Sequence, residues 1–167
     1  MNLLDRMLGH DRWTTARLLE QSRGLCDTQL DQPFDIGHRT LRETFEHMIH
    51  GVEVWAAAIA RQPVAPHKDD QSLAALIERH GRSSTTFATV ARRVHDEQLL
   101  DETFLDPWTE SATPRTFGGT IVHVILHNAQ HRSEVLHILQ RLGVPDLPDG
   151  DPLEWEDETT SIEPIGT

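Results

Sequence analysis

The sequence contains a single cysteine, Cys26, among its 167 residues. One cysteine excludes an internal disulfide, so we expect a protein of the reducing cytoplasm. No apolar run approaches the roughly 20 residues that a membrane-spanning helix needs. Charged side chains within the first dozen residues interrupt any apolar signal segment. Together these absences predict a cytoplasmic protein that does not enter a membrane.

Basic charge is also scarce. The chain has 15 Lys and Arg against 27 Asp and Glu, for a net charge of −12, and eight of the acidic residues follow Gly143, where no Lys or Arg occurs. The rest of the chain is therefore only mildly acidic and has no basic stripe, so nucleic-acid binding is not expected. The acidic tail is predicted to be mainly solvated, although Leu153 and Trp155 could pin part of it onto the body.

Apolar residues recur at helical spacing in four segments. We expect helices over about 2–23, 40–61, 73–95 and 120–142. Ser72 suits the N-cap of the third helix, whereas Gly81 and the Ser/Thr run 83–86 disfavour it. The stretch 96–119 contains two prolines and is predicted to be irregular. The sequence thus predicts an all-α fold, a four-helix bundle over residues 1–145, followed by an irregular acidic tail over 146–167.

Two histidines in the fourth predicted helix have the spacing of metal ligands. His127 and His131 lie one turn apart within an apolar arc, separated by a rise of about 6 Å. Burying two imidazoles is costly unless each has a partner, which a shared cation would supply. His47 faces inward on the second helix. Without the pair on the fourth helix, the simpler interpretation of His47 would be a core histidine with one hydrogen bond. Three neutral imidazoles with an open position are typical of a catalytic metal site.

The remaining histidines are expected to play other roles. His123 lies at the edge of the apolar arc, about 12 Å along the helix from His131, so it is predicted to support the site rather than ligate the ion. His50 points to the solvent side of the second helix. For the others no grouping is visible and a solvated position is the expectation: His10, His38, His67, His80, His95 and His137.

A permanent charge also falls on the apolar arc of the fourth helix. Arg132 lies near its middle, and Asp11 lies in the middle of the apolar arc of the first helix. Buried charges must be paired, so we predict an Asp11–Arg132 ion pair, with Glu20 as an alternative partner. Asn128 also faces inward and is expected to orient a ligand.

Several known site types are excluded by the same residues. The helix reads His-Asn-Ala-Gln-His and lacks the glutamate that follows the first histidine in zinc metalloproteases. A di-iron bundle needs two Glu-x-x-His pairs, and only Glu134 with His137 fits, on a face expected to point away from the core. No histidine lies near Cys26 in the sequence to make it a nucleophile, and no Gly-rich phosphate loop is present.

Four motifs spread over most of the chain carry a resemblance. They are His10-Asp-Arg-Trp13, Glu46-His47-Met48 with Trp55 following, His123-x3-His127-x3-His131-Arg132, and Leu139-Gln-Arg-Leu-Gly-Val144 before a Pro/Asp segment. With these motifs the chain resembles the DinB/YfiT-like superfamily of metal-dependent bundles. The resemblance implies up-down-down-up topology, a homodimer, and a divalent metal held by His47, His127 and His131. The sequence departs from the family's common His-Arg-Gly-Gln at Ser133 and Glu134.

Some relatives in that superfamily are thiol-dependent transferases or isomerases that use mycothiol or bacillithiol. The resemblance therefore implies a metal-assisted enzyme, a thiol S-transferase or a hydrolase-like enzyme, with a low-molecular-weight thiol as small-molecule substrate. Zinc is the expected ion, with nickel, manganese or iron as alternatives, because imidazole suits them all. The competing hypothesis is a non-catalytic metal-binding or stress-related structural protein. Ile49 and Ala56 widen the apolar arc of the second helix, which also favours a homodimer.

Overall fold

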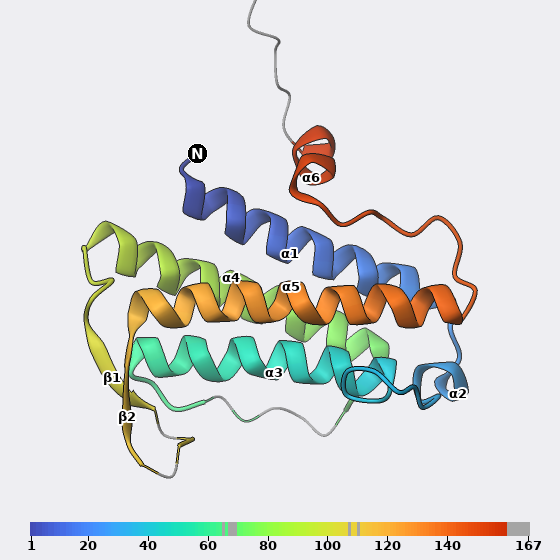
Figure 1. The fold of residues 1–167 in the computed structure, drawn as a ribbon, viewed down its shortest axis with the longest axis horizontal. Coiled ribbons are helices and arrows are strands. Elements are labelled where there is room, and N and C mark those ends of the chain that lie inside the picture. Colours follow the sequence, from blue (N-terminus) through green and yellow to red (C-terminus); the bar gives the residue numbers. More distant parts are fainter. Residues whose placement is uncertain (65, 67–69, 107, 110, 160–167) are drawn as a thin grey trace, which may run out of the picture.

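The computed structural model describes residues 1–167 except 65, 67–69, 107, 110 and 160–167. The fold is predominantly helical, which confirms the all-α prediction (Figure 1). In chain order its elements are α1 Leu3–Gln21, the 3-10 turn η1 Ser22–Gly24, α2 Asp27–Leu30, α3 Leu41–Ala60, α4 Leu73–Asp96, β1 Thr103–Asp106, β2 Thr113–Thr116, α5 Phe117–Arg141 and α6 Pro152–Thr159.

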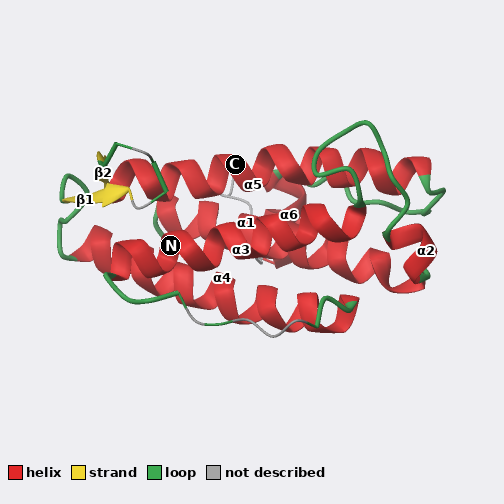
Figure 2. Cartoon of the chain, turned by 90° about the horizontal axis from the view of Figure 1, so that it is seen from below, coloured by secondary structure: helices red, strands yellow, loops and turns green. Residues whose placement is uncertain are grey.

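The long helices α1, α3, α4 and α5 lie side by side. α3 packs against α4 and α5, and α1 packs against the same two helices on the other side (Figure 2). The colour gradient shows that α1 and α5 run in one direction and that α3 and α4 run in the other (Figure 1). This arrangement brings the face of α3 that carries His47 against the face of α5 that carries His127 and His131.

The core is divided into two apolar clusters with a polar band between them. One cluster includes Val52, Phe87 and Ile121, and the other includes Leu18, Phe45 and Ile138. On α1, α4 and α5, the residues between these clusters are buried but polar: Asp11, Thr14, Thr15, Arg79, His80, Ser83, Ser84, Asn128, His131 and Arg132. The candidate metal ligand His131 thus belongs to a polar layer in the middle of the molecule.

The start of α4 is where its predicted cap places it. The Ser72 hydroxyl accepts a hydrogen bond from the Ala75 amide, which confirms it as the N-cap of α4. This helix continues through Gly81, and its hydroxyl side chains are satisfied by carbonyls of the preceding turn: Thr85 donates to Gly81 and Thr89 to Thr85. Burial of apolar residues such as Phe87 outweighs the low helix propensity of this segment.

The prediction that residues 96–119 are irregular is wrong in part. β1 pairs antiparallel with β2, in a register that places Thr103 opposite Thr116 and Leu105 opposite Pro114. A proline is tolerated because a two-stranded ribbon has only edge strands. The following helix α5 begins at Phe117, earlier than expected, because Thr116 caps it through the Gly119 amide. The Phe104 ring lies 6.0 Å from that of Phe117, which ties the hairpin to the core.

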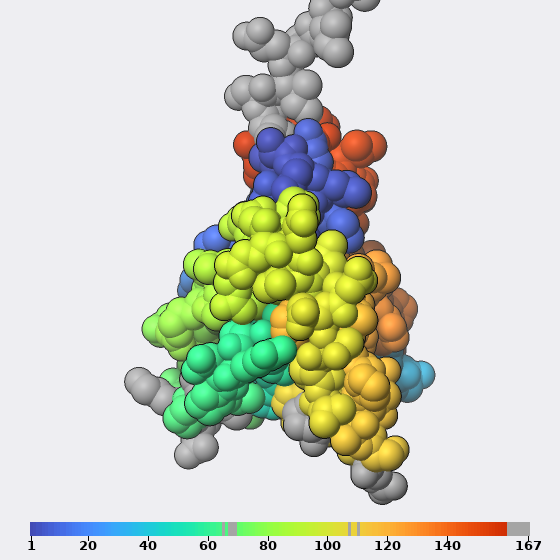
Figure 3. Space-filling view, turned by 90° about the vertical axis from the view of Figure 1, so that its left-hand side faces the viewer, coloured from blue at the N-terminus to red at the C-terminus, as the bar shows by residue number. Residues whose placement is uncertain are grey.

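The acidic tail is also more ordered than predicted, since residues 152–159 form α6 instead of an irregular segment. α6 packs against α1 (Figure 3). Trp155 is buried there, in line with the alternative that the sequence left open, whereas Leu153 is 70% exposed and does not pin the tail. Glu158 of α6 accepts a hydrogen bond from Arg17 of α1 at 2.8 Å. Acidic residues of the tail therefore have basic partners on the body.

Within the described part of the chain, no helix has both the length and the apolar character required to cross a membrane.

Candidate metal centre

Three histidine side chains from two helices meet at one point of the polar band. The Nε2 atom of His127 lies 3.3 Å from Nε2 of His47 and 3.2 Å from Nε2 of His131. The rings of His47 and His131 are 4.9 Å apart and nearly perpendicular. The structure therefore brings together all three residues that the sequence predicted as metal ligands.

The spacing of these nitrogens fits a small divalent cation. A zinc ion binds imidazole nitrogen at about 2.0–2.1 Å, so two ligands at tetrahedral positions are about 3.3 Å apart. The Nε2 separations of His127 from His47 and from His131, 3.3 and 3.2 Å, match that edge. At this distance two neutral imidazoles could also form one N–H···N hydrogen bond. A third nitrogen at the same point would then lack a hydrogen-bond partner of its own. The arrangement is thus suited to holding a cation.

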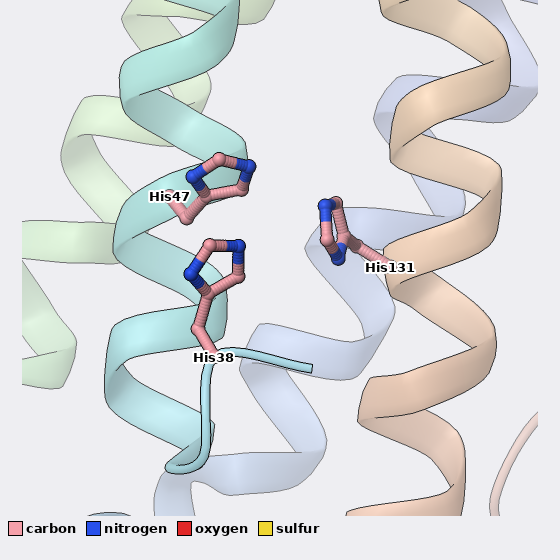
Figure 4. A group of neighbouring side chains, drawn as sticks. All are labelled: His38, His47 and His131. Carbon is pink, nitrogen blue, oxygen red and sulfur yellow. The ribbon is translucent and has the colours of Figure 1, made fainter. Parts of the chain in front are cut away.

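A fourth histidine, His38, belongs to the same cluster, and the prediction that it is solvated is wrong. Its ring stacks on that of His47 at a centroid distance of 3.7 Å. Ligand nitrogens of His38, His47 and His131 all lie within 4.8 Å of one another, a group that does not include His127 (Figure 4). His38 comes from the loop between α2 and α3, where no helical period indicates a direction. Sequence patterning therefore had no means of placing it.

The electrostatics of the cluster favour neutral imidazoles. Burial, followed by the neighbouring His38, His131 and His127 in that order, lowers the pKa of His47 to about 4. Burial is also the main cause of the lowered pKa of His127, followed by His131 and His123. Only a neutral imidazole can donate its lone pair to a metal, so both groups are in the ligating form at neutral pH.

Glu134 orients one of the three predicted ligands. Its Oε2 atom lies 2.6 Å from Nδ1 of His131, which leaves Nε2 of that ring directed toward His127. A carboxylate behind a ligating histidine holds the ring and raises its basicity. The expectation that Glu134 points away from the core is wrong: its side chain is only 17% exposed. The sequence did contain a signal for this contact: Glu134 follows His131 by three residues, a spacing that places two side chains next to each other on a helix.

The predicted ion pair between Asp11 and Arg132 is confirmed. The Arg132 guanidinium donates to Oδ1 of Asp11, and both residues are buried. Asn128, which was expected to orient a ligand, instead donates to Oδ2 of Asp11 at 3.3 Å. This network joins α1 to α5 one residue beyond His131, so it fixes the position of the helix that carries two of the candidate ligands.

Cavities lie on both sides of the histidine cluster. One of about 340 Å³ is lined by His38, Arg39, Glu43, Glu46, His47 and Gln71. Another of about 500 Å³, beside the hairpin, is lined by Trp55, Asp106, Pro114, Arg115, Thr116, Gly119, Thr120 and His123. The exposed His123 ring lies 5.2 Å from that of His127, so it separates this second cavity from the cluster. That His123 supports the site and does not ligate the ion stays a prediction.

The remaining described histidines are not part of this cluster, although His50 is among the lesser causes of the lowered pKa of His47. His95 and His137 are exposed, as expected, and the His50 side chain is 42% exposed. His10 is half-buried, with Nε2 at 2.9 Å from the Gly150 carbonyl. The prediction that His80 is solvated is wrong, because it is 6% exposed in the polar band. The sixth histidine of that group, His67, lies outside the described residues.

Comparison with known proteins identifies the family of the chain. The family model described as the DinB superfamily matches residues 10–135, a span that contains His38, His47, His127 and His131. No curated protein matched the sequence. Because the family model covers more than half of the chain, the protein belongs to the DinB superfamily.

Proposed function

We propose that the protein binds one divalent metal ion through His47, His127 and His131. The observation that carries the proposal is the pair of Nε2 separations, 3.3 and 3.2 Å, which match adjacent positions around zinc. Zinc is the ion we expect first, and nickel, manganese or iron would accept the same imidazoles. Membership of the DinB superfamily, whose members are often metal-binding, supports the same assignment.

We further propose that the centre serves a metal-assisted reaction of a low-molecular-weight thiol. A divalent ion with an open position lowers the pKa of a thiol or water bound to it and acts as a Lewis acid. The chain's own part is to keep His47 and His127 neutral, to orient His131 through Glu134, and to leave space beside the cluster. The cavity of about 340 Å³ beside His47 is large enough for a small thiol and favours an enzyme.

The alternative is a metal-binding protein without turnover, in a structural or stress-related role. The observation that favours it is the stacking of His38 on His47. The His38 side chain at this position would hinder a substrate from reaching the ion. Structural zinc sites are likewise closed by protein side chains. A screen for thiol conjugation separates the two functions, since only the enzyme would release a product.

For the whole molecule we propose the superfamily's four-helix bundle with up-down-down-up topology over 1–145, in a cytoplasmic homodimer. The exposed Cys26 thiol suits a reducing compartment. Ile49 and Ala56 cannot form the dimer contact, because both are buried within the protomer. Val122 and Leu126 on α5 are exposed large apolar residues and better candidates. Sedimentation at tens of micromolar that shows only monomer would refute the dimer.

The metal proposal is tested by elemental analysis of protein purified without an affinity tag. We expect one divalent ion per chain, and we expect His47→Ala, His127→Ala or His131→Ala to abolish binding. His123→Ala is the matched control, since it removes a histidine from the same helix face and should retain most of the metal. If His123→Ala loses metal as fully as His127→Ala, the ligand assignment is wrong.

A further inference from the structure

We infer that His38 is a fourth protein ligand, carried by the loop before α3, which closes the coordination position left by the three helical histidines. The inference rests on the proposed metal site and adds a residue that the sequence had placed in solvent. A ligand nitrogen of His38 lies within 4.8 Å of those of His47 and His131 (Figure 4). His127 contacts His47 and His131 from the other side, at Nε2 separations of 3.3 and 3.2 Å, so a cation between these rings would have four imidazoles available, the ligand number that zinc prefers.

His38 has no competing partner that would explain its position. Among the described residues, none is hydrogen-bonded to its ring nitrogens, and its ring contacts are with His47 and His131. Stacking of the His38 and His47 imidazoles at a centroid distance of 3.7 Å shields the facing sides of both rings from water. A cation shared by the two rings would compensate for that desolvation.

The loop that carries His38 is held in place by contacts on both sides of the residue. Phe34 is buried, and its amide donates to the Arg39 carbonyl at 2.6 Å, which closes the loop around His38. Gly37 has φ +57°, and a β-carbon at that residue would lie 2.7 Å from Oε2 of Glu134. Since Glu134 also holds His131, the backbone next to His38 is packed against the partner of another ligand.

This position has a consequence for access to the metal. His38 and His47 both line the cavity of about 340 Å³, so His38 borders the space from which a small molecule would approach the ion. A thiol that enters from this cavity would have to displace His38 before its sulfur could bind. His38 therefore acts as an exchangeable ligand that protects the ion until a stronger ligand arrives.

The test uses the full chain loaded with Co²⁺, whose visible absorption reports ligand type and geometry. His38→Ala removes the imidazole, and His38→Phe keeps a ring that can stack on His47 but cannot bind metal. His95→Ala, which removes an exposed histidine at the end of α4, is the matched control. We expect both His38 variants to shift the cobalt spectrum and to bind Zn²⁺ at least tenfold more weakly. Free imidazole should restore the spectrum of His38→Ala.

Titration with 2-mercaptoethanol gives a second readout. The thiolate-to-cobalt band should appear at a lower thiol concentration in both His38 variants than in the wild type. Unchanged spectra and affinity in both variants would overturn the inference while leaving the three-histidine site intact. Weakened binding in His38→Ala alone would also overturn it, because His38 would then act by packing. Failure of the wild type to bind any divalent ion would refute the proposed function itself.

Discussion

Gly37 and Glu134 are packed so closely that a single added methyl group would have to displace the Glu134 carboxylate. A β-carbon at Gly37 would lie 2.7 Å from the carboxylate oxygen that holds the His131 ring at 2.6 Å. The contact links the loop that carries His38 to the helix that carries His131. Two segments nearly a hundred residues apart in the sequence are thereby held next to each other at the candidate metal centre.

We expect Gly37→Ala to weaken both the fold and the metal site. Alanine at φ +57° costs about 1–2 kcal/mol, and the clash would push Glu134 away from His131. Thermal melts and Zn²⁺ affinity measure the two effects. Gly81→Ala is the control: nothing lies within 4 Å of its β-carbon, and in mid-helix it should stabilise the protein by about 0.5–1 kcal/mol. Equal behaviour of the two variants would contradict the proposed contact.

Removal of the Arg132 side chain should be strongly destabilising even without metal. Arg132→Ala leaves the buried carboxylate of Asp11 without its cation, and loss of one buried partner typically costs about 3–5 kcal/mol. His127→Ala should instead lose only the stabilisation that bound metal provides and leave metal-free stability near that of the wild type. Melts of both variants with and without chelator distinguish the roles. A wild-type melting temperature for Arg132→Ala would contradict the burial of the pair.

The metal-free protein should lose stability as the pH falls from about 6.5 toward 4. Burial, followed by the nearby Arg12 and Arg132, lowers the pKa of His80 from 6.5 to about 4. Between these values the unfolded chain binds a proton that the folded chain does not, so unfolding becomes more favourable, by up to about 3 kcal/mol. Urea titrations across this range should show a smaller loss for His80→Gln. A pH dependence identical to that of the wild type would exclude His80 as a source.

Metal affinity should also fall over an acidic range. His47 and His127 have lowered pKa values and remain neutral at pH 7, so protons compete with the ion only at lower pH. Zn²⁺ titrations at a series of pH values measure this competition. Occupancy that is unchanged down to pH 4 would indicate carboxylate ligands in place of imidazoles.

Docking of the tail should depend on Trp155 and not on Leu153. Trp155 is 6% exposed against Gly9 of α1, whereas Leu153 is 70% exposed. Trp155→Ala should therefore cost about 3–5 kcal/mol if the cavity cannot collapse, and less if α6 detaches. Leu153→Ala should change stability by no more than about 0.5 kcal/mol. Denaturant melts compare them, and similar losses in both variants would mean that α6 packs differently.

The sequence by itself determined the elements whose signals are local. Helical periodicity placed the four long helices, and Ser72 placed the start of α4, because capping and amphipathic burial depend on residues a few positions apart. The one-turn spacing of His127 and His131 indicated their convergence for the same reason. Arg132 and Asp11 each lie on the apolar arc of a predicted helix. Because buried charges must be paired, this was enough to predict their ion pair.

Tertiary structure alone decided what depends on distant segments. His38 joins the cluster because its loop folds back onto Glu134, a contact that no short-range pattern encodes. His80 is buried because α1 and α5 cover that face of α4, and the hairpin of β1 and β2 forms by pairing across a turn. Trp155 is buried because Gly9, distant in sequence, leaves room for its ring. In each case the free energy comes from packing between elements, which is absent until the helices have assembled.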